Sequence, residues 1–593
     1  MANQVVVRSG SKWLHFKQPL YIIETYRLDE VIPKLLDIEE IANRFSLYVA
    51  GFISYEAASA FDSALTTHPS TSFPLIWFGL YKEPDSLSFL STFTESERHD
   101  NFWNLSIDQD GYRQALERIK GSIAMGETYQ VNYTFRLYSK YSEDPFTLFR
   151  QLMMSQPVEY ASYVETDQFA ICSASPELFF DLDGHQLTTR PMKGTASRGL
   201  TLITDQEQSN RLQNSLKDRA ENLMIVDMMR NDLGRIALPG SIRVSKLFEV
   251  EKYPTVWQMT STVSSRTQAS FSEILTALFP SASITGAPKV QTMKIITDLE
   301  NSPRKIYTGA IGYLFPNRKA QFSVAIRTVL IDKWNGACEY GVGSGVVWDS
   351  VDQLEFEECM VKAKILTDPC PDFSIFESLL WENNNYFLLS YHLDRLHNSA
   401  EYFDFPIDVP LIKKRLLEFS TTLSAVEQNR PHKIRLILSP TGQIECQSTP
   451  ITRNLDQQLI KVKLASTPID PSDRFLYHKT TKRDIYEQAK MDNPDCDDVL
   501  LWNKQGEITE SCVANVVVDI KGKLITPPVS SGLLAGTFRA WLLDHQKISE
   551  RIVTIDEVLM ANRIYLINSV RKWRRADLTA PHAKDYKLQR QPI

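Results

Sequence analysis

The stretch Arg190-Pro191-Met192-Lys193-Gly194-Thr195-Ala196 decides how the first part of the chain is interpreted. A lysine is rarely fixed between Pro and Gly for packing reasons, because its ammonium group prefers water. Pro191 restricts the local backbone, and Gly194 allows the backbone to approach a ligand closely. An exposed lysine on a turn is the alternative interpretation of this stretch alone, so the rest of the sequence has to decide between the two.

The composition sets broad limits on the function. The chain has 593 residues, too many for one hydrophobic core, and a net charge of −7 that indicates neither a nucleic-acid partner nor an anionic membrane surface. Seven cysteines without CxxC spacing indicate neither a disulfide framework nor a zinc site. The first twenty residues lack the apolar core of a signal peptide, and no stretch reaches the roughly 18–20 apolar residues of a membrane span. We therefore expect a cytoplasmic protein without a membrane segment.

Two prolines in the run Thr367–Asp372 mark the clearest domain boundary. Prolines spaced by one residue stop a helix and favour an extended linker. We place a first module at 1–367, a linker at 368–373 and a second module at 374–593. Both modules mix strand-like and helix-like patterns, which predicts an α/β or α+β fold.

Several elements are predicted from residue patterns. Apolar runs predict strands over 169–180, 310–315, 321–330 and 337–347, and a long amphipathic pattern predicts one helix over 206–233. In the second module, 374–380 and 385–389 predict a hairpin that turns at Asn383-Asn384.

A carboxylate pair marks the predicted helix 352–364. Glu355, Glu358 and Lys362 share one face of that helix, and two carboxylates three residues apart suit Mg²⁺. A solvated face with one Glu–Lys pair is the alternative. Upstream, the glycine-rich run 341–345 allows backbone N–H groups to approach a carboxylate, and Arg327 ends a predicted strand where it could bind a second carboxylate.

These features stand among long runs that resemble one family. The first module resembles the chorismate-utilising enzymes, specifically the group of aminodeoxychorismate synthase component I and anthranilate synthase component I. The matching runs are GETYQVNYT (126–134), SASPELFF (173–180), RPMKGTASRG (190–199), KDRAENLMIVDMMRNDLGRI (217–236), FPSASITGAPK (279–289), YTGAIGY (307–313), AIRT (325–328), GVGSGVVWDS (341–350) and QLEFEECMVKAK (353–364). The resemblance implies a chorismate-binding fold of antiparallel sheets flanked by helices.

The resemblance also implies the chemistry at Lys193. Anthranilate synthases carry a small residue at this position, whereas aminodeoxychorismate synthases carry the lysine, so we expect amination of chorismate at carbon 4. Lys193 would attack carbon 2 as a neutral amine, which requires a lowered pKa. Glu177 matches the general acid/base of the family, and a carboxyl group that stays protonated near neutral pH needs a raised pKa.

The remaining site residues of the first module carry over from the matching motifs. The expected Mg²⁺ ligands are Glu221 and Glu358, with Glu355 nearby through water. Five residues are expected near the substrate: Arg327 and Gly345 at its carboxylates, Gln130 near carbon 2, Lys362 beside the carboxylates, and Gln258 in place of a histidine found in anthranilate synthases.

The nitrogen source is not evident in this chain. A glutamine amidotransferase needs a nucleophilic cysteine on a glycine-rich turn, and none of the seven cysteines has that context. We therefore expect a separate glutamine amidotransferase subunit, or free ammonia, as the supplier of nitrogen.

The second module contains another lysine, in His478-Lys479-Thr480-Thr481. With YHLDRL (391–396), GEITES (506–511), GLLAGTFR (532–539) and NSVR (568–571), it resembles the fold-type IV pyridoxal-phosphate enzymes, whose fold has two α/β subdomains. The resemblance implies that Lys479 forms the Schiff base and that Glu510 pairs with the pyridine nitrogen. It further implies that the phosphate is held by Arg395, the backbone of Thr537 and Phe538, and Ser569. Arg435 is a candidate for binding a substrate carboxylate.

The two resemblances together predict a bifunctional enzyme of 4-aminobenzoate synthesis for folate. The first module would aminate chorismate with Mg²⁺, and the second would be an aminodeoxychorismate lyase that releases pyruvate with pyridoxal 5'-phosphate. Two alternatives are an anthranilate-type synthase fused to an aminotransferase, and a non-catalytic scaffold subunit. A homodimer through the second module is expected from the resemblance.

Overall fold

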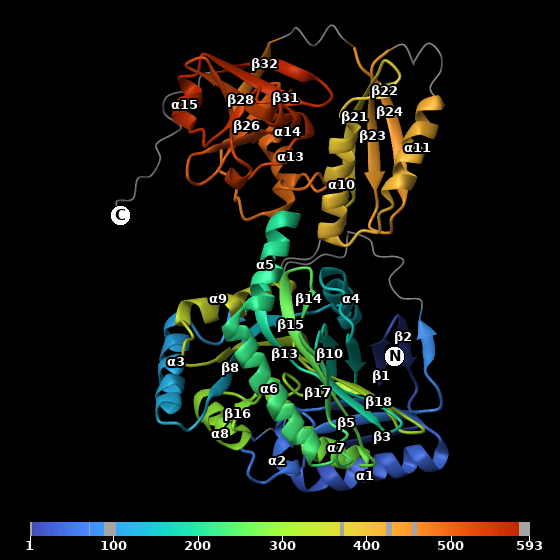
Figure 1. Ribbon diagram of the computed structural model, residues 1–593. Coiled ribbons are helices and arrows are strands. Elements are labelled where there is room, and N and C mark those ends of the chain that lie inside the picture. Colours follow the sequence, from blue (N-terminus) through green and yellow to red (C-terminus); the bar gives the residue numbers. More distant parts are fainter. Residues whose placement is uncertain are drawn as a thin grey trace. The chain divides into compact units, whose positions relative to one another are not determined.

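The computed structural model describes residues 3–69, 72–87, 102–367, 373–422, 430–452 and 459–579 (Figure 1). Most of the predicted linker 368–373 lies outside the described residues. The chain divides into two compact units. The first unit comprises Met1–Ser197 and Ser209–Cys370, and the second comprises Arg198–Gln208 and Pro371–Ile593.

The first unit is built on two ten-stranded antiparallel sheets. One sheet has the order β16-β8-β20-β19-β10-β9-β1-β2-β6 with β7 on β8, and the other has the order β13-β15-β12-β11-β18-β17-β4-β5-β3 with β14 on β15. The strands of the first sheet are β16 (Gly286–Ala287), β8 (Gln130–Lys140), β20 (Ala337–Val346), β19 (Thr328–Asp332), β10 (Phe169–Ser173), β9 (Ser162–Glu165), β1 (Gln4–Ser9), β2 (Lys12–Phe16), β6 (Asp85–Leu87) and β7 (Asn104–Leu105). Those of the second are β13 (Met192–Ser197), β15 (Val256–Arg266), β12 (Gln186–Arg190), β11 (Leu178–Asp183), β18 (Lys319–Val324), β17 (Ala310–Phe315), β4 (Tyr48–Ile53), β5 (Ile76–Tyr81), β3 (Tyr21–Thr25) and β14 (Arg243–Lys252).

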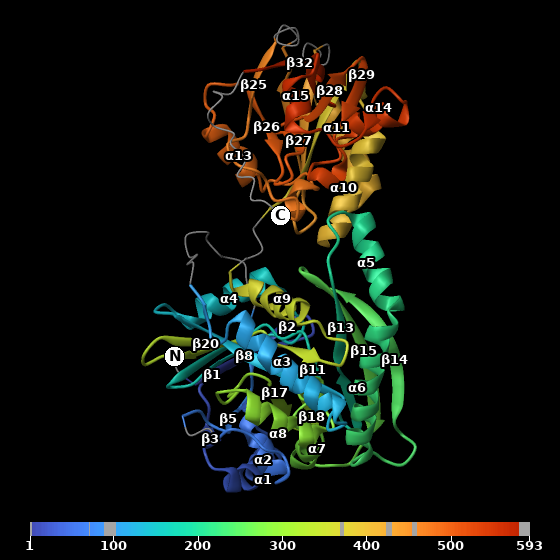
Figure 2. The ribbon, with the colours of Figure 1, turned by 90° about the vertical axis from the view of Figure 1, so that its left-hand side faces the viewer.

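Helices flank these sheets, as the family resemblance implies. They are α1 (Leu28–Phe45), α2 (Ala58–Phe61), α3 (Gln109–Ala124), α4 (Pro145–Ser155), α6 (Leu216–Gly234), α7 (Phe271–Leu278), α8 (Lys289–Leu299) and α9 (Asp352–Ala363). Helix α6 lies along β13 and β15, and this contact brings Glu221 and Asn222 to the strand that carries Lys193 (Figure 2).

Two predicted strands are broken in the structure, and both breaks position site residues. The strand expected over 169–180 is β10 in the first sheet followed by β11 in the second, and Pro176 between them has no N–H for either ladder. The strand expected over 321–330 is β18 followed by β19, with Arg327 between them at a left-handed φ of 51°. Glu177 and Arg327 therefore lie on irregular backbone at strand ends.

The helix expected over 206–233 is also two helices, α5 (Leu202–Asn214) and α6. Ser215 has extended backbone angles and its side chain accepts a hydrogen bond from the backbone N–H of Asp218, so it caps the start of α6. The prediction of a single helix was wrong. The apolar spacing continues through Ser215, although one helix ends before it and the next begins after it.

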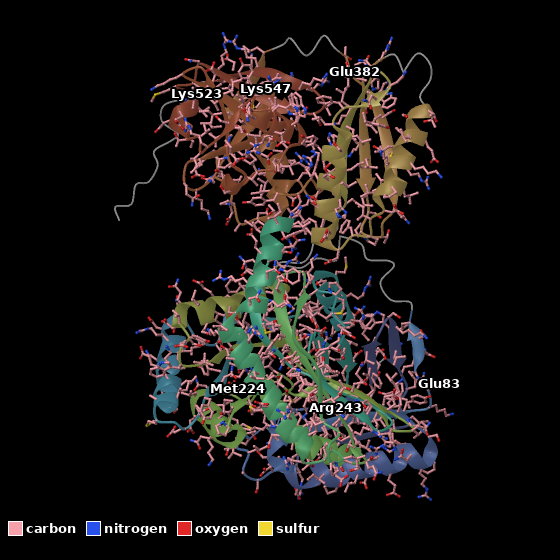
Figure 3. The ribbon with its side chains drawn as sticks, in the orientation of Figure 1. Glu83, Met224, Arg243, Glu382, Lys523 and Lys547 are labelled. Carbon is pink, nitrogen blue, oxygen red and sulfur yellow. The ribbon has the colours of Figure 1, made fainter. Side chains whose placement is uncertain are left out.

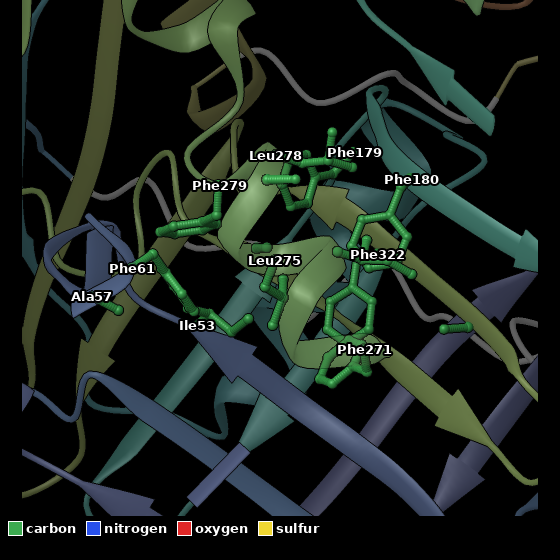
Figure 4. Close-up of a cluster of buried hydrophobic side chains, with 14 of the residues drawn as sticks. Ile53, Ala57, Phe61, Phe179, Phe180, Phe271, Leu275, Leu278, Phe279 and Phe322 are labelled. Carbon is green, nitrogen blue, oxygen red and sulfur yellow. The ribbon is translucent and has the colours of Figure 1, made fainter. Parts of the chain in front are cut away.

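An aromatic cluster around α7 packs the helices onto the second sheet (Figure 4). The ring of Phe322 lies 5.2 Å from Phe180 and 5.3 Å from Phe271, and Phe179 contacts Phe279 at 6.0 Å. Full burial of each such side chain contributes about 1.5–3 kcal/mol. The cluster thereby fixes the end of α7 and the short helical turn Ala282–Ile284 that follows it.

The second unit has two sheets, as expected for two subdomains. A four-stranded antiparallel sheet has the order β22-β21-β23-β24, and an eight-stranded sheet has the order β27-β26-β25-β32-β31-β28-β29-β30 with an extra β27–β28 pairing that closes part of it into a barrel. The strands are β21 (Ile375–Glu382), β22 (Asn385–Tyr386), β23 (His432–Leu438), β24 (Ile444–Pro450), β25 (Ile460–Leu464), β26 (Asp498–Trp502), β27 (Ile508–Ser511), β28 (Asn515–Ile520), β29 (Lys523–Thr526), β30 (Ser549–Glu550), β31 (Arg563–Asn568) and β32 (Lys572–Leu578). The helices are α10 (Leu389–Phe403), α11 (Val409–Thr421), α13 (Asp484–Met491), α14 (Thr537–Asp544) and α15 (Ile555–Leu559).

The predicted hairpin of the second unit is confirmed, but its second strand ends at Tyr386 and α10 begins at Leu389, within the range expected to be strand. Glu382 pairs with Asn385, and Asn383 and Asn384 both have positive φ angles, 52° and 56°. Two consecutive left-handed residues match the twist of antiparallel strands, and Asn tolerates that conformation better than most residues. Among the helices of the described part of the chain, none is long and apolar enough to cross a membrane.

Two candidate active sites

The first unit contains a cavity of about 500 Å³ that is lined by most of the predicted site residues. These lining residues are Glu177, Lys193, Glu221, Gln258, Arg327, Gly345, Glu355, Glu358 and Lys362. They come from segments spread over almost two hundred residues of sequence, and the two sheets with α6 and α9 bring them together.

A β-bulge directs Lys193 toward this cavity. The pairing of β13 with β15 shifts between Met192 and Thr195, and Gly194 within the bulge has a φ of +97° that only glycine adopts readily. The side chain of Asn222 donates a hydrogen bond to the carbonyl of Lys193 at 3.2 Å, and that of Gln258 donates one to the carbonyl of Gly194 at 2.9 Å. The backbone at the lysine and at the glycine that follows it is therefore fixed.

The electrostatics of this cavity suit a neutral amine beside a protonated acid. Burial lowers the pKa of Lys193 below the ordinary lysine value, although the carboxylates of Glu221 and Glu177 act in the opposite direction. Burial raises the pKa of Glu177 to about 7. Both directions are those that the expected chemistry of a nucleophilic amine and a general acid requires.

Ser283 is a functional candidate that the sequence alone did not indicate. Its hydroxyl donates a hydrogen bond to Oε1 of Glu177 at 2.5 Å, and its oxygen lies 2.9 Å from that of Ser281. The hydrogen bond opposes the effect of burial and lowers the pKa of Glu177. Ser283 lies within the quoted run FPSASITGAPK, which was the only available signal for it.

Acidic and basic groups share one end of the cavity. Burial opposes ionisation of Glu358, but Lys362 at 2.7 Å outweighs it and lowers the pKa of Glu358. Lys362 also donates a hydrogen bond to the carbonyl of Gly343 at 3.0 Å. Burial raises the pKa of Glu221, and Lys193 opposes that effect.

The carboxylates fit Mg²⁺ as donors. Within the residues that the structure describes, no three His, Cys, Asp or Glu side chains are grouped closely enough to hold a metal ion by themselves. Mg²⁺ is, however, often bound by one or two carboxylates together with water and substrate oxygens. Glu221 and Glu358 line the same cavity and can supply two such carboxylates.

Gly345 and Gln130 lie next to the nucleophile. A Cβ atom built on Gly345 would lie 2.8 Å from Nζ of Lys193 and 2.6 Å from Nε2 of Gln130. Both polar atoms of the Gln130 side chain are buried without a hydrogen-bond partner, and so is Nη1 of Arg327. Buried polar atoms of this kind are usually paired, so these groups fit contacts with a polar ligand.

The second unit contains a cavity of about 460 Å³ around Lys479. The predicted residues Arg395, Arg435, Glu510, Thr537 and Ser569 line the same cavity. Burial lowers the pKa of Lys479 to about 7, and the positive charge of Arg395 acts in the same direction.

Glu510 lies in the same cavity as a buried, hydrogen-bonded carboxyl group. It accepts hydrogen bonds from the hydroxyl of Tyr486 at 2.7 Å and from the backbone N–H of Leu534 at 3.2 Å. Burial raises its pKa to about 7. A carboxyl group held in this way fits a contact with the ring nitrogen of pyridoxal phosphate.

Arg395 has a buried partner that the sequence did not reveal. Its Nε and Nη2 atoms donate to the two oxygens of Glu377 at 2.8 and 2.6 Å, and His392 lies 2.6 Å from the same carboxylate. Burial opposes ionisation of Glu377, but Arg395 and His392 outweigh it and hold its pKa at about 2. Glu377 fixes the arginine in one orientation.

Two of the parts expected at the phosphate, the start of α14 and Ser569, line the cavity. Thr537 lines the cavity at the start of α14. The backbone N–H groups in the first turn of a helix have no partner within the helix. The side chain of Phe538 instead packs into an apolar cluster with Trp541, 5.9 Å away. Phe538 is not among the residues that line the cavity, so a contact of its backbone with the phosphate stays a prediction. The lysine, the carboxyl group and these donors together fit pyridoxal phosphate.

Comparison with known proteins identifies the family. Residues 4–368 match the family described as chorismate binding enzyme. The chain belongs to this family. Residues 374–578 match the family described as amino-transferase class IV.

Curated relatives cover the first part of the chain. Aminodeoxychorismate synthase component 1 of Bacillus subtilis is 39% identical over 295 residues, which are 49% of this chain and 59% of that protein. The protein of the same name from Escherichia coli is 39% identical over 262 residues, which are 44% of this chain and 57% of that protein. The chain thus spans less than two thirds of the length of these relatives.

A solved structure shows the same fold. The crystal structure of anthranilate synthase component I from Streptococcus pneumoniae aligns with a TM-score of 0.52 at 23% identity, over 62% of this chain and 93% of that one. At this identity the likeness concerns the fold alone.

Proposed function

We propose that the chain makes 4-aminobenzoate from chorismate in two steps, one in each unit. The observation that carries this proposal is a pair of partly buried lysines with lowered pKa values, each lining a cavity together with a buried carboxyl group. The relatives named aminodeoxychorismate synthase component 1 support the first step. The match to amino-transferase class IV supports the cofactor of the second step.

In the first site, the neutral amine of Lys193 would bond to carbon 2 of chorismate while the hydroxyl at carbon 4 leaves. Glu177, protonated near neutral pH, would give its proton to that hydroxyl, so that water departs. Ammonia would then bond to carbon 4 and release Lys193. Asn222 and Gln258 would keep the amine in position, because they fix the backbone around it.

Cations would hold the two carboxylates of chorismate. Mg²⁺ would supply positive charge at the ring carboxylate, with Glu221 and Glu358 as ligands and Glu355 in contact through water. Arg327 would bind a carboxylate through Nη1, which is buried and has no partner. Gly345 would leave the space that the amine of Lys193 and the ring occupy.

In the second site, bound pyridoxal phosphate would supply an electron sink. Lys479 would hold the cofactor and then take the proton from carbon 4 of the aminated ring. Glu510 would contact the pyridine nitrogen, and Arg395, Thr537 and Ser569 would hold the phosphate. Loss of the proton at carbon 4 lets the neighbouring enolpyruvyl group leave as pyruvate, and the ring becomes aromatic.

A separate glutamine amidotransferase would deliver ammonia to the first site, and free ammonia would substitute for it in the test tube. A homodimer through the second unit stays a prediction from the family resemblance.

The test uses the purified full-length chain with chorismate, Mg²⁺, ammonia and pyridoxal phosphate, with products separated by chromatography and identified by mass. We expect 4-aminobenzoate and pyruvate in equal amounts. Lys479→Ala should accumulate aminodeoxychorismate and lack the visible absorbance of the bound cofactor, whereas the control Lys482→Ala should behave as wild type.

Each half of the proposal can fail separately. Anthranilate as the product, or no aminated product, would contradict the first step. Accumulation of aminodeoxychorismate by the wild-type chain loaded with cofactor would contradict the second step only.

A further inference from the structure

Arg304 is a buried charged residue of the first unit that the proposed mechanism does not use. Charged side chains usually stay in water, and Glu83 and Arg243 of the same unit are exposed (Figure 3). Arg304, in contrast, is only 2% exposed. A buried charge is costly unless it is paired and hydrogen-bonded, so the partners of this guanidinium indicate its role.

Glu300 is the counter-charge of Arg304. It follows the last residue of α8, and its side chain is buried. One carboxylate oxygen accepts a hydrogen bond from Nε of Arg304 at 3.0 Å, and the other accepts one from Nη2 at 2.6 Å. The ring of Tyr55 lies 4.6 Å from the same guanidinium. A bidentate pair of this kind, stacked on an aromatic ring, fixes the plane of the guanidinium.

The guanidinium also binds two backbone carbonyls. Nη1 donates to the carbonyl of Ile284 at 3.0 Å, and Nη2 donates to that of Asn132 at 2.8 Å. Nη1 is in addition 3.4 Å from the hydroxyl of Thr308. Ile284 ends the short turn Ala282–Ile284, and Asn132 lies on β8. One side chain therefore ties this turn to the first sheet.

Both tied segments line the cavity of the first unit, at Asn132, Ser283 and Ile284. Arg304 is not among the residues that line this cavity. The hydroxyl of Ser283, the neighbour of Ile284, lies 2.5 Å from Oε1 of Glu177. The guanidinium thus holds the backbone beside this serine from behind the cavity.

Another hydrogen bond joins the same two segments. The backbone N–H of Asn132 donates to the carbonyl of Thr285 at 2.7 Å. That carbonyl is one residue farther from Ser283 than the carbonyl bound by Arg304. The bond from Arg304 is therefore the one that restrains the peptide group next to the serine.

We infer that Arg304, oriented by Glu300, is a positioning residue that holds the hydroxyl of Ser283 on the carboxyl group of Glu177. The inference rests on the proposed function, in which Glu177 is the general acid of the first step. Without the hydrogen bonds of Arg304 the turn would shift, and the hydroxyl would move away from its acceptor. Because this hydroxyl stabilises the charged form of the carboxyl group, its displacement would raise the pKa of Glu177.

The test replaces Arg304 by lysine in the full-length chain. Lysine keeps the positive charge but lacks the planar fork that reaches Glu300 and both carbonyls. The pKa of Glu177 is measured without turnover, from the infrared absorbance of its protonated carboxyl group, which Glu177→Gln identifies. Complete loss of a hydrogen bond to a carboxylate changes its pKa by about one to two, so a displaced hydroxyl should raise it by about 0.5 to 1. The alkaline limb of kcat/KM for chorismate should move by the same amount.

Two further variants test whether the effect passes through Ser283. In Ser283→Ala, the additional change Arg304→Lys should alter the pKa of Glu177 by less than about 0.3, because the hydroxyl is already absent. Tyr55→Leu leaves the hydrogen bonds of Arg304 and removes only the ring beside it. It should raise the same pKa by a smaller amount, and it supplies the test if Arg304→Lys does not fold.

Arg136→Lys is the matched control. Arg136 is also 2% exposed, and its nearest approach to Glu300 is 4.0 Å. In the described part of the chain, its hydrogen bonds go outside the turn Ala282–Ile284, to Thr134, Phe135, Pro303 and Glu339. This variant should lower the melting temperature to a similar degree and leave the pKa of Glu177 unchanged within about 0.2.

Three results would overturn the inference. They are an unchanged pKa of Glu177 in Arg304→Lys, an equal rise in Arg136→Lys, and a further rise when Arg304→Lys is added to Ser283→Ala. A purely structural role of Arg304 would give the first of these together with a lower melting temperature. Failure of the proposed function has a different signature, because wild type would then form no aminated product, whereas the infrared measurement needs no turnover.

Discussion

We predict that the hydrogen bond from Ser283 to Glu177 sets the pH range of the first reaction. Glu177 must be protonated to act as an acid, so its contribution falls as the pH rises through its pKa of about 7. The hydroxyl of Ser283 lies 2.5 Å from Oε1 of Glu177 and lowers that pKa. Ser283→Ala therefore raises the pKa and moves the alkaline limb of the synthase profile to higher pH.

The size of this change follows from the charge on the acceptor. A hydrogen bond to a charged group contributes about 1.5–3 kcal/mol, and one pKa unit corresponds to about 1.4 kcal/mol. Loss of the Ser283 hydroxyl should therefore raise the pKa of Glu177 by about one to two. For each protein, the rate at pH 8 is divided by the rate at low pH. This ratio should be about five to ten times larger for Ser283→Ala than for wild type.

The assay is kcat/KM for chorismate between pH 6 and about 9.5 at constant free ammonia, with wild type and variant in the same buffers. Because ammonia ionises identically in both reactions, the ratio of the two profiles isolates the enzyme group. Ser173→Ala is a suitable control, since Ser173 is equally buried and bonds to Thr328 outside the cavity. Superimposable alkaline limbs for Ser283→Ala and wild type would refute the role assigned to this hydrogen bond.

Three further substitutions test the nucleophile Lys193, the space next to it at Gly345, and the stability that Glu377 gives to the second unit. Lys193→Ala should lower the synthase rate by at least about a thousandfold while the second unit still converts added aminodeoxychorismate, and an unchanged synthase rate would remove Lys193 from the mechanism. Gly345→Ala should lower synthase kcat about 10- to 100-fold and leave the melting temperature unchanged, because the new methyl group would displace the amine of Lys193. If the activity were lost only because the variant is unfolded at the assay temperature, this explanation would be contradicted. Glu377→Gln should destabilise the second unit by about 3 kcal/mol in urea unfolding, since it leaves the guanidinium of Arg395 without its counter-charge, and an unchanged midpoint would contradict the buried pair.

Sequence patterns were sufficient for the regular parts of the fold. The strand over 310–315 is where the apolar run places it, and the Asn383-Asn384 turn follows from the conformational tolerance of asparagine. The breaks near Glu177 and Arg327 were missed, because an apolar run shows burial but not where backbone pairing stops.

Some of the site residues could also be predicted from the sequence, and others could not. Lys193 was indicated by Pro191 and Gly194 beside it and by the family resemblance. Lys479 has no such neighbours, and its role was predicted only from the resemblance of several runs in the second module. Ser283 could not be paired with Glu177, which lies 106 residues away in sequence, since only the folded chain brings a serine hydroxyl to that carboxyl group. Glu377 was missed because a single glutamate in an apolar strand has no local pattern that reveals an arginine partner from a neighbouring helix.

The position of the new amine tests the central claim most directly. The full-length chain is supplied with chorismate, Mg²⁺, pyridoxal phosphate and nitrogen-15 ammonia, and the aromatic product is examined by NMR. The account predicts the label on an amine opposite the carboxyl group, in 4-aminobenzoate. A label on the carbon next to the carboxyl-bearing carbon, in 2-aminobenzoate, would contradict it.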